Sequence, residues 1–469
     1  MNSTLIRLDA EQNRIMDWRL GSKDIAAVVG PPGCGKTTIG SALAGNMIID
    51  GFADKVLLTA YTNAATDEFG RELCVLLGDT TASKLCVRAG NGDAADRSLP
   101  IPFSNDVELI RSKKIILCTI LSLPRLPKDT RFDRLIIDEA SITKIDQLLI
   151  PLQMSLSSSS NTRSSFFYKS NLTANDYRLP NLQQQLKELM NFLGHCGVAA
   201  TVVGDPKQSQ PISLSSDGGA DGYYNSLSAI EWIINSAGHD TLHITHRLPD
   251  RLASLVDDFA QYGGLISAPE VAGRRLNLTN MYALEDDFKQ ILDPAEVVTW
   301  LDMHNSEEMP SKESSWINQA EARACTKICR QLVKLMPRPQ QLKEEQRIVI
   351  VTRFTGQVMA IRNLLAQMGL FDNHDIRVTT TTSALGTQGD IVLFSLVRNN
   401  PERYLGAAGA LQDLNVSISR AKKKLIIVGS FDMMTNGYCG HTKTNHARNL
   451  ARLIESKYGQ VIEAPLVLK

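Results

Sequence analysis

The sequence has no excess of charge of either sign, no long apolar run and no closely spaced pair of cysteines. Among its 469 residues, 50 are Lys or Arg and 50 are Asp or Glu, so overall basicity does not indicate a nucleic-acid partner, although a groove can be basic in a neutral protein. No apolar run reaches the roughly 18 residues of a membrane span, and the N-terminus lacks a secretory apolar region. The 8 cysteines form no C-x-x-C pair, which fits a reducing compartment. We therefore expect an intracellular protein, cytoplasmic or nuclear.

One stretch near the start carries the full phosphate-binding pattern G-x-x-x-x-G-K-[ST]. The apolar run Ile25–Val29 precedes it and a helical segment, Thr38–Met47, follows it, which is the strand–loop–helix setting that the pattern requires. Backbone N–H groups of such a loop and the helix N-terminus surround a phosphate. We expect Lys36 to reach the β- and γ-phosphates and Thr37 to ligate Mg²⁺. The predicted nucleotide-binding loop is Gly30, Pro31, Pro32, Gly33, Cys34, Gly35, Lys36, Thr37 and Thr38.

Short apolar clusters alternate with helical patterns through the first half of the chain. Each cluster is continuous rather than alternating, which is typical of a strand covered on both faces. This pattern predicts an α/β fold with a doubly wound parallel sheet. The predicted strands are Ala26–Val29, Val56–Thr59, Ile115–Cys118, Leu135–Ile137 and Thr201–Val203.

The same alternation continues in the second half without a second phosphate loop. We therefore expect two α/β domains, residues 1–237 and 238–469, with a serine-rich insert at about 153–181. The second set of predicted strands is Leu242–Ile244, Val297–Trp300, Arg347–Val351, Arg377–Thr380, Ile391–Ser395 and Leu425–Val428.

Polar residues at two further strand ends complete a candidate hydrolytic site. Asp138 and Glu139 follow the apolar run at Leu135–Ile137, about a hundred residues after the phosphate loop. An enzyme with such a loop needs a carboxylate there to hold Mg²⁺, which suits Asp138, and a second group to orient the attacking water, which suits Glu139. Gln208 follows another predicted strand, and its amide can donate to the γ-phosphate while accepting from the water.

The order of these motifs resembles that of the superfamily-one helicases, in the branch of the nonsense-mediated-decay (UPF-like) helicase. The resemblance implies two tandem RecA-like domains of a P-loop NTPase, with ATP hydrolysed in the cleft between them. It runs from about Leu8 to Gly429. Its motifs are Leu8–Gln12, Thr59–Asp67, Asp138–Ser141, Gly204–Gln208, Thr245–Leu248, Val349–Phe354 and Leu414–Lys422.

The resemblance also implies roles for residues outside the phosphate loop. Gln12 would hydrogen-bond the adenine, and His246 stands where the branch often has a Tyr that stacks on it. Arg247 and Arg420 would be arginine fingers supplied by the second domain. Such arginines stabilise the charge of a phosphoryl-transfer transition state, so the site would be complete only when the domains close.

The motif at Ser383–Asp390 departs most from the family pattern. Leu385 replaces a Gln and Gln388 replaces a Glu, so the amide of Gln388 brings no charge, although with Gly386 it is still expected at the nucleotide. Coupling between ATP and strand binding is therefore expected to be weaker. The chain begins almost at the adenine motif, and the region between the motif Thr59–Asp67 and Asp138 is short. Accessory domains that help to clamp the strand and split duplexes in this branch are therefore not expected here. For this reason we expect ATP hydrolysis rather than processive unwinding.

Several side chains near these motifs suit contacts to a nucleic-acid strand. Hydroxyls, amides and arginines fit phosphate and sugar contacts, which carry no sequence information. Phe354 could stack a base. We expect the lysine run Lys422–Lys424 to be exposed to solvent at the start of a β-strand. The predicted strand contacts are Thr62, Asn63, Arg88, Thr119, Thr352, Arg353, Phe354 and Ser383.

Two hypotheses follow. The first is an ATP- and Mg²⁺-dependent helicase or translocase that acts as a monomer on single-stranded RNA or DNA, with 5′-to-3′ polarity by family resemblance. The second is a nucleotide-dependent clamp or scaffold that hydrolyses ATP poorly. An unrelated P-loop enzyme, such as a small-molecule kinase, does not account for the motifs of the second domain. No sequence feature separates RNA from DNA, because backbone contacts do so through the 2′-OH.

Overall fold

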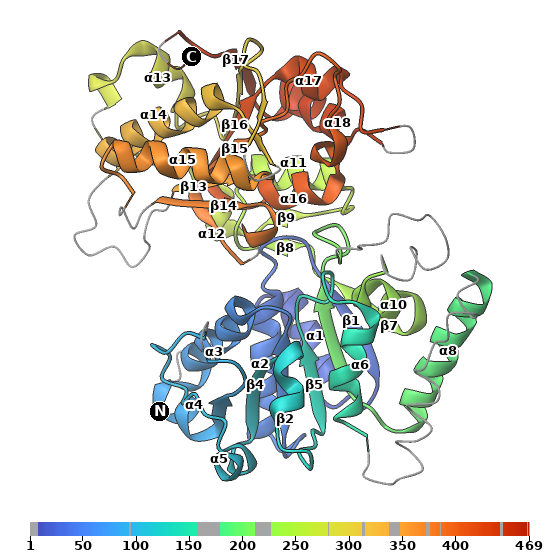
Figure 1. Cartoon of the computed structure of the whole chain (residues 1–469). Coiled ribbons are helices and arrows are strands. Elements are labelled where there is room, and N and C mark those ends of the chain that lie inside the picture. The colour runs from blue at the N-terminus through green and yellow to red at the C-terminus, as the bar shows by residue number, and fades with distance from the viewer. Residues whose placement is uncertain are drawn as a thin grey trace. The chain divides into compact units, whose positions relative to one another are not determined.

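The computed structural model describes residues 8–92, 95–156, 179–211, 227–279, 281–311, 315–336, 348–371, 376–384, 386–440, 444–466 and 468, without the side chains of 179–183 and 283. The chain divides into two compact units, Met1–His243 and Ile244–Lys469 (Figure 1). Most of the serine-rich insert, and Leu385 with it, lie outside the described residues.

The first unit is built on a parallel sheet in the order β3-β4-β2-β5-β6-β1-β7. The carboxyl ends of β1, β2, β5 and β6 therefore meet at one edge, which is where ligands bind in open α/β sheets. The strands are β1 (Ile25–Val29), β2 (Val56–Ala60), β3 (Cys86–Arg88), β4 (Ile115–Thr119), β5 (Arg134–Ile137), β6 (Ala200–Gly204) and β7 (Gly238–Thr241).

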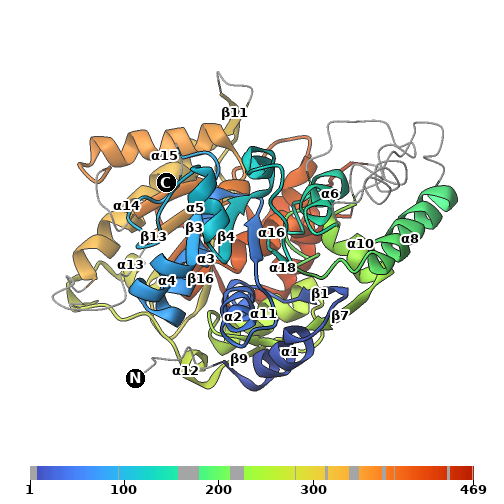
Figure 2. The same ribbon diagram turned by 90° about the horizontal axis from the view of Figure 1, so that it is seen from below.

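Helices cover both faces of this sheet (Figures 1 and 2). Alternate strand residues such as Ile25 and Ala27 pack into one apolar core with α6, α8 and α10, while Gly40 of α2 packs against Phe69 of α3 and Ile136 on the other face. The helices are α1 (Ala10–Leu20), α2 (Lys36–Ile49), α3 (Asn63–Leu77), α4 (Asp79–Leu85), α5 (Val107–Ser112), η1 (Ile120–Arg125), α6 (Ile145–Gln153), α8 (Leu179–His195) and α10 (Ala229–Ser236).

The second unit is built on a parallel sheet in the order β14-β13-β15-β16-β10-β17, with the small pairs β11-β12 and β8-β9 beside it. The predicted α/β fold with parallel sheets is confirmed. The strands are β8 (Ile244–Thr245), β9 (Ile266–Ser267), β10 (Val298–Asp302), β11 (Met309–Pro310), β12 (Trp316–Ile317), β13 (Ile348–Thr352), β14 (Ile376–Thr380), β15 (Gly389–Ser395), β16 (Ala421–Gly429) and β17 (Gln460–Glu463).

The helices of the second unit bury apolar faces against this sheet. In α14, residues such as Cys325, Ile328, Cys329 and Leu332 are fully buried, which accounts for the helical spacing of its two cysteines. The helices are α11 (Asp250–Ala260), α12 (Pro269–Ala272), η3 (Met281–Ala283), α13 (Asp286–Ile291), α14 (Gln319–Leu335), α15 (Thr355–Gln367), η4 (Thr382–Ala384), η5 (Gly406–Gly409), α16 (Leu411–Ile418), α17 (Phe431–Asn436), α18 (His446–Leu453) and η6 (Ile454–Tyr458).

Two local expectations differ from the structure. Residues 238–243, predicted for the second domain, belong to the first unit because β7 pairs with β1 along its length. Lys424, predicted to be solvated, is fully buried in β16, and burial lowers the pKa of its ammonium to about 8. Its Nζ donates to the backbone oxygens of Asp293 and Glu296, so it ties β16 to the loop that precedes β10. Within the described ranges, none of the helices combines the length and apolar character that crossing a membrane requires.

Candidate nucleotide site

The phosphate loop joins β1 to α2 through two glycines in left-handed conformation. Gly33 has φ 78° and Gly35 has φ 73°, a region that residues with a Cβ rarely adopt. A Cβ on Gly35 would also lie 2.4 Å from Nε2 of Gln12, so the side chain of α1 closes over the loop. Gly30 N donates to Gly204 O at 3.2 Å, which fixes the start of the loop to the end of β6.

The Lys36 ammonium lies within this loop. Its Nζ donates to Gly30 O at 2.6 Å and to Pro31 O at 3.0 Å. Because a phosphate brings stronger, charged acceptors than a backbone carbonyl, the ammonium has better partners in a loaded loop. The lysine is thus placed where the motif predicts it.

Thr37 and Asp138 are in contact although they stand 101 positions apart in the sequence. Thr37 Oγ1 donates to Asp138 Oδ2 at 2.8 Å. Burial raises the pKa of the Asp138 carboxyl, while hydrogen bonds from Glu139 N and Thr37 and the charge of Lys36 oppose that rise. A buried carboxylate next to a hydroxyl fits Mg²⁺, which prefers oxygen ligands and keeps several waters. Within the part of the chain that the structure describes, no group of three or more His, Cys, Asp or Glu side chains is arranged to hold a metal. The oxygens of Thr37 and Asp138 fit a Mg²⁺ whose remaining ligands are waters and phosphate oxygens.

Glu139 has an unusual backbone and an unexpected partner. Its φ is 56°, left-handed for a residue with a side chain. Its Oε2 accepts from Thr62 N and from Thr62 Oγ1, each at 2.9 Å. Thr62 also caps α3, because its Oγ1 accepts from Ala65 N at 3.2 Å. Thr62, which is predicted to contact the nucleic-acid strand, is thus hydrogen-bonded directly to Glu139, the predicted water-orienting carboxylate.

Gln208 and Gln12 both lie at this edge with their amides partly engaged. Gln208 Nε2 donates to Asp205 Oδ2 at 2.8 Å, and Asp205 is 1% exposed at the end of β6. Gln12 forms a capping box with Asp9 at the start of α1, and its Nε2 donates to Cys34 O at 3.2 Å. The amide of Gln12 is therefore held against the phosphate loop.

In the second unit, the two predicted arginine fingers lie near one another in the fold. Arg247 Nε donates to Gln388 Oε1 at 3.0 Å, and its Nη1 donates to the backbone oxygen of Ser419 at 3.3 Å. Arg420 follows Ser419; it is 3% exposed, and its Nε donates to Val416 O at 3.2 Å. Gln388, which departs from the family pattern, thus holds the side chain of Arg247.

His246 directly precedes Arg247, and Gly386 lies two residues before Gln388. His246 Nδ1 lies 2.8 Å from Glu270 Oε1, and the hydrogen bond from His246 is the main cause that lowers the pKa of the Glu270 carboxyl. Gly386 is exposed with φ 74°. Both positions remain proposals for nucleotide contacts.

Arg88, which is predicted to contact the nucleic-acid strand, lies in the interior of the first unit. It is 1% exposed, and its Nε donates to Asp67 Oδ1 at 2.8 Å in a buried ion pair. Its other nitrogens donate to Ala89 O and to Asn63 Oδ1, both at 2.6 Å. This placement does not favour a direct contact with a strand. Instead, Arg88 braces the first turn of α3, where Thr62 and Asn63 lie.

The other residues that are predicted to contact the nucleic-acid strand differ in how exposed their side chains are. Thr119 and Thr352 are buried, and the Thr119 hydroxyl donates to Ser122 Oγ at 2.9 Å. Ser383 is exposed and Phe354, which precedes α15, is half-buried. Arg353 is half-buried and forms an ion pair with Asp413. Ser383, Phe354 and Arg353 are the more accessible candidates.

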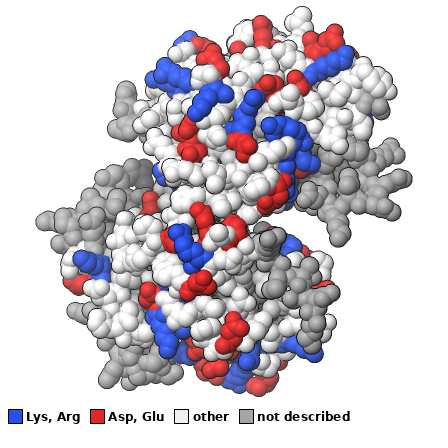
Figure 3. Space-filling view, turned by 180° about the vertical axis from the view of Figure 1, so that it is seen from behind, with Lys and Arg blue, Asp and Glu red and all other residues white. Residues whose placement is uncertain are grey.

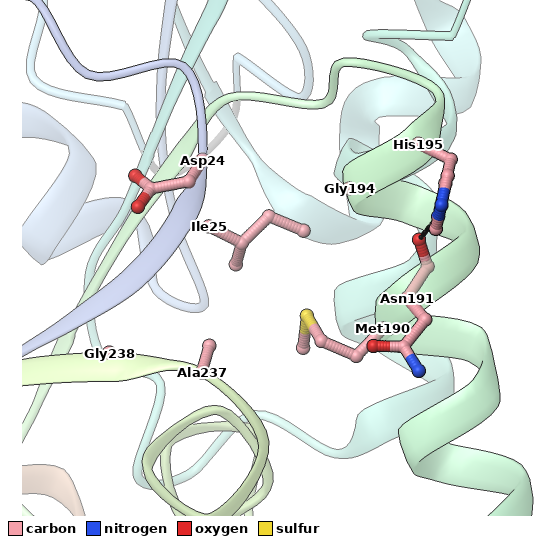
Figure 4. Close-up of a pocket in the computed structure, with 8 residues that line it drawn as sticks. All are labelled: Asp24, Ile25, Met190, Asn191, Gly194, His195, Ala237 and Gly238. Carbon is pink, nitrogen blue, oxygen red and sulfur yellow. Dashed lines mark hydrogen bonds between the residues drawn. The ribbon is translucent and has the colours of Figure 1, made fainter.

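A cavity of about 480 Å³ opens at the opposite edge of the first sheet (Figure 4). It lies at the amino ends of β1 and β7, so it is separate from the phosphate loop, which follows the carboxyl end of β1. Ile25 and Met190 face each other across it, and the His195 ring is bonded to Asn191 O at 2.6 Å. The residues that line this cavity do not form a recognisable catalytic arrangement. They are Asp24, Ile25, Met190, Asn191, Gly194, His195, Ala237 and Gly238.

Sequence reasoning missed the partners of the motif residues. Asp67, Asp413 and Glu270 each hold a predicted site residue. Asp67 ends the motif Thr59–Asp67, but the motif does not indicate which cation this carboxylate pairs with, and Asp413 and Glu270 lie outside the motifs. The contact between Thr62 and Glu139 was missed as well. It follows from the pairing of β2 with β5, which places the residues after these strands side by side and which no local sequence pattern indicates.

Comparison with known proteins places these observations in context. Two family profiles, each described as "AAA domain", match residues 7–154 and 226–432. Regulator of nonsense transcripts 1 of Dictyostelium discoideum is 24% identical over 95% of this chain and 32% of its own length. DNA replication ATP-dependent helicase/nuclease DNA2 of Gallus gallus is 26% identical over 91% of this chain and 36% of its own. The chain thus spans about a third of the length of these curated relatives.

Among solved structures, the arterivirus nonstructural protein 10 helicase in complex with DNA aligns with 89% of this chain and 63% of its own. The identity is 12% and the TM-score is 0.40.

Proposed function

We propose that this chain, a relative of the superfamily-one helicases in the UPF-like branch, is an ATP-dependent helicase or translocase acting on single-stranded RNA or DNA. The observation that carries the proposal is the 2.8 Å hydrogen bond between Thr37 Oγ1 and Asp138 Oδ2, because it joins the phosphate loop to the hydrolysis motif. The similarity to proteins named as a regulator of nonsense transcripts and as a DNA replication helicase supports the same reading.

The first unit supplies the binding half of the proposed reaction. The loop N–H groups and Lys36 hold the phosphates of ATP, while Gln12 reads the base from α1. Thr37 and Asp138 are the residues that would hold Mg²⁺, which neutralises charge on the β- and γ-phosphates when it is bound. Glu139 and Gln208 orient the attacking water in line with the leaving oxygen.

The second unit supplies the charge that the transition state requires. Arg247 and Arg420 approach the γ-phosphate when the two units close around ATP. An arginine finger contributes on the order of 10³–10⁵ in rate, so hydrolysis depends on closure. Repeated closure and opening, with strand contacts on both units, moves the protein along a single strand with 5′-to-3′ polarity. We propose Thr62, Asn63, Thr352, Arg353, Phe354 and Ser383 as those strand contacts.

A general electrostatic attraction does not drive strand binding in this proposal. Figure 3 shows one face of the molecule on which Lys and Arg side chains are interspersed with Asp and Glu. Equal numbers of basic and acidic residues, 50 each, agree with that distribution. Strand binding is therefore assigned to local contacts at the motif residues.

The alternative is a nucleotide-dependent clamp or scaffold with weak hydrolysis. The observation that favours it is the hydrogen bond between Arg247 and the neutral Gln388, which engages the side chain of one proposed arginine finger within its own unit. A clamp would bind ATP and strand but would turn over slowly whether or not the strand is present.

The test is the steady-state ATPase rate with and without single-stranded RNA and DNA of the same sequence. We expect stimulation in the wild-type protein and loss of hydrolysis in Lys36→Ala. A Lys36→Ala variant that hydrolyses ATP at the wild-type rate contradicts the site assignment. Hydrolysis that responds to neither polymer favours the clamp.

A further inference from the structure

Three aromatic side chains are exposed on the second unit, in segments that follow the carboxyl ends of its strands. Trp316 lies in β12, which follows β10, while Tyr404 follows β15 and Tyr438 follows β16 and α17. Their exposed fractions are 36%, 43% and 48%. Within the described residues, no hydrogen bond engages the indole N–H of Trp316 or the hydroxyl of either tyrosine. These three residues, which we call the aromatic ledge, therefore combine apolar ring faces with unused hydrogen-bond donors.

The rings of the aromatic ledge are linked by the guanidinium of Arg398 and by direct contact. The Cζ atom of Arg398 lies 4.7 Å from the ring centre of Trp316 and 5.8 Å from that of Tyr404. The ring centres of Tyr404 and Tyr438 are 5.4 Å apart, a distance typical of packed aromatic pairs. The three rings and the guanidinium thus form one continuous surface.

Arg398 supports this surface without giving it a free positive charge. Its side chain is 7% exposed and forms an ion pair at 2.9 Å with Glu308, whose side chain is 4% exposed. Its Nε also donates to Tyr404 O at 3.2 Å. The charge of the guanidinium is therefore compensated by a buried carboxylate.

The backbone that carries the ledge is fixed by contacts from several elements. Val397 and Arg403 have φ 72° and 55°, a left-handed conformation that persists only where surrounding contacts impose it. Val397 N donates to Oε2 of the buried Glu321 at 2.8 Å. Leu405 N donates to Tyr438 O at 2.8 Å, and Tyr438 N donates to Arg403 O at 2.9 Å. The ledge is therefore ordered before any partner binds, which lowers the entropy cost of binding.

The charges beside the ledge are mainly acidic. Glu307 precedes the carboxylate that pairs with Arg398, and Glu402 lies two residues before Tyr404. Both are exposed, and neither forms an ion pair within the described part of the chain. Arg403, the exposed cation of this loop, is paired with Asp432 at 2.9 Å. A phosphodiester backbone needs cations to neutralise it, so these charges disfavour a nucleic-acid strand and favour a basic partner.

We propose that the aromatic ledge binds a basic, proline-rich segment of a partner protein in the polyproline II conformation. Proline rings pack on exposed aromatic faces, and the carbonyls of this helix have no internal partners, so they accept from Tyr hydroxyls and an indole N–H. Lysine or arginine side chains of the segment pair with Glu307 and Glu402. The proposal goes beyond the function proposed above, because none of these residues belongs to the nucleotide site or to the proposed strand contacts.

The test is fluorescence anisotropy of the full chain with a labelled peptide of repeated Arg-Pro-Pro triplets. We expect saturable binding. Trp316→Ala and Tyr404→Ala are each expected to weaken it on the order of tenfold, because exposed aromatic anchors dominate such interfaces. Phe371→Ala is the matched control, since Phe371 is a 56% exposed aromatic residue of the same unit outside the ledge. It is expected to bind the peptide as the wild type does.

Charge and peptide conformation are tested separately. The double variant Glu307→Gln with Glu402→Gln is expected to bind the Arg-Pro-Pro peptide more weakly at low salt and as the wild type does at high salt, because salt screens exposed charges. Labelled peptides of repeated Glu-Pro-Pro and of repeated Arg-Gly-Ser triplets are each expected to bind the wild type on the order of tenfold more weakly.

Absence of saturable binding by the Arg-Pro-Pro peptide overturns the proposal, as does equal binding by the wild type and the ledge variants. A loss of affinity for labelled single-stranded RNA or DNA in Trp316→Ala and Tyr404→Ala also overturns it and assigns the ledge to the strand. Self-association of the wild type that Tyr404→Ala abolishes overturns it in favour of a second copy of this chain. Failure of the proposed function is distinguishable, because it is seen in the ATPase rate of the wild type, which the ledge variants are expected to share.

Discussion

At the residue scale, the phosphate loop depends on the absence of a side chain at Gly35. This glycine combines φ 73° with a close approach of Gln12 Nε2, at 2.4 Å from the position of a Cβ. Gly51 offers a matched case. Its φ is 75°, yet no atom lies within 4 Å of its Cβ position.

We predict that Gly35→Ala and Gly51→Ala each lose about 1 kcal/mol of unfolding free energy through backbone strain. Only Gly35→Ala is expected to lose nucleotide affinity, because its methyl group displaces Gln12 and reshapes the loop. Urea unfolding and titration with a fluorescent ATP analogue measure the two effects. Equal nucleotide affinity in both variants would show that the loop tolerates a side chain there.

Motif residues could be predicted from the sequence because their chemistry fixes their identity and spacing. Lys36, Thr37 and Asp138 are the clearest cases, since the pattern names them and the structure brings them together. Arg88 shows the limit, because an arginine near a strand end is equally suited to a phosphate and to a buried carboxylate. Only the position of Asp67 decides between them, and that position depends on packing.

At the element scale, α14 and β15 share a buried carboxyl that makes the second unit sensitive to pH. Glu321 is fully buried, and its Oε2 accepts from Ser395 Oγ at 2.7 Å and from Val397 N at 2.8 Å. Burial raises the pKa of this carboxyl to about 8, against the opposing effect of these hydrogen bonds. Between pH values of about 4.5 and about 8, the Glu321 carboxyl therefore keeps its proton in the folded unit and loses it in the unfolded chain.

The sign of the effect follows from that difference. Because the pKa is raised in the folded state, the stabilisation is complete below about pH 4.5 and declines as the pH rises to about 8, with a slope of at most about 1.4 kcal/mol per pH unit. We predict that Glu321→Gln removes this slope. Urea unfolding at pH 5, 6.5 and 8 tests the prediction, and parallel pH profiles of the two proteins would refute it.

The strands that could be predicted are those made of continuous Val, Ile and Leu, because burial on both faces requires such residues. β7 and β17 were not predicted, since Gly238–Thr241 is Gly-His-Asp-Thr and Gln460–Glu463 begins and ends with polar residues. Both are edge strands whose place comes from pairing with β1 and β10. Sheet order, which joins Thr62 to Glu139, also comes from packing and not from any local pattern.

At the scale of the whole molecule, the motif order predicted the relationship to superfamily-one helicases, and the comparisons confirm it. The division of roles between the units is a proposal. If the second unit supplies the positive charge that stabilises the transition state, then substitution of its arginines lowers the turnover rate more than it lowers nucleotide affinity.

We predict that Arg247→Ala and Arg420→Lys lower kcat on the order of 10³-fold while leaving ATP affinity within a few fold. Arg420→Lys is the milder change at a position that is 3% exposed, so it preserves packing better than Ala would. ATPase kinetics alongside nucleotide titration give the comparison, with Arg403→Ala, an exposed arginine of the same unit, as the control. A loss of affinity equal to the loss of rate would place these arginines in ground-state binding.

The chain leaves the first unit beside its nucleotide site, and this has a mechanical consequence. β7 is bonded to β1, Leu242 N donates to Val29 O at 2.9 Å, and His243 N donates to Glu11 Oε2 at 2.7 Å. Tension on the connecting chain therefore reaches the strand that ends at the phosphate loop and the helix that carries Gln12. A load along β7 is shared by the hydrogen bonds that pair it with β1, so it acts on the strand that leads into the phosphate loop.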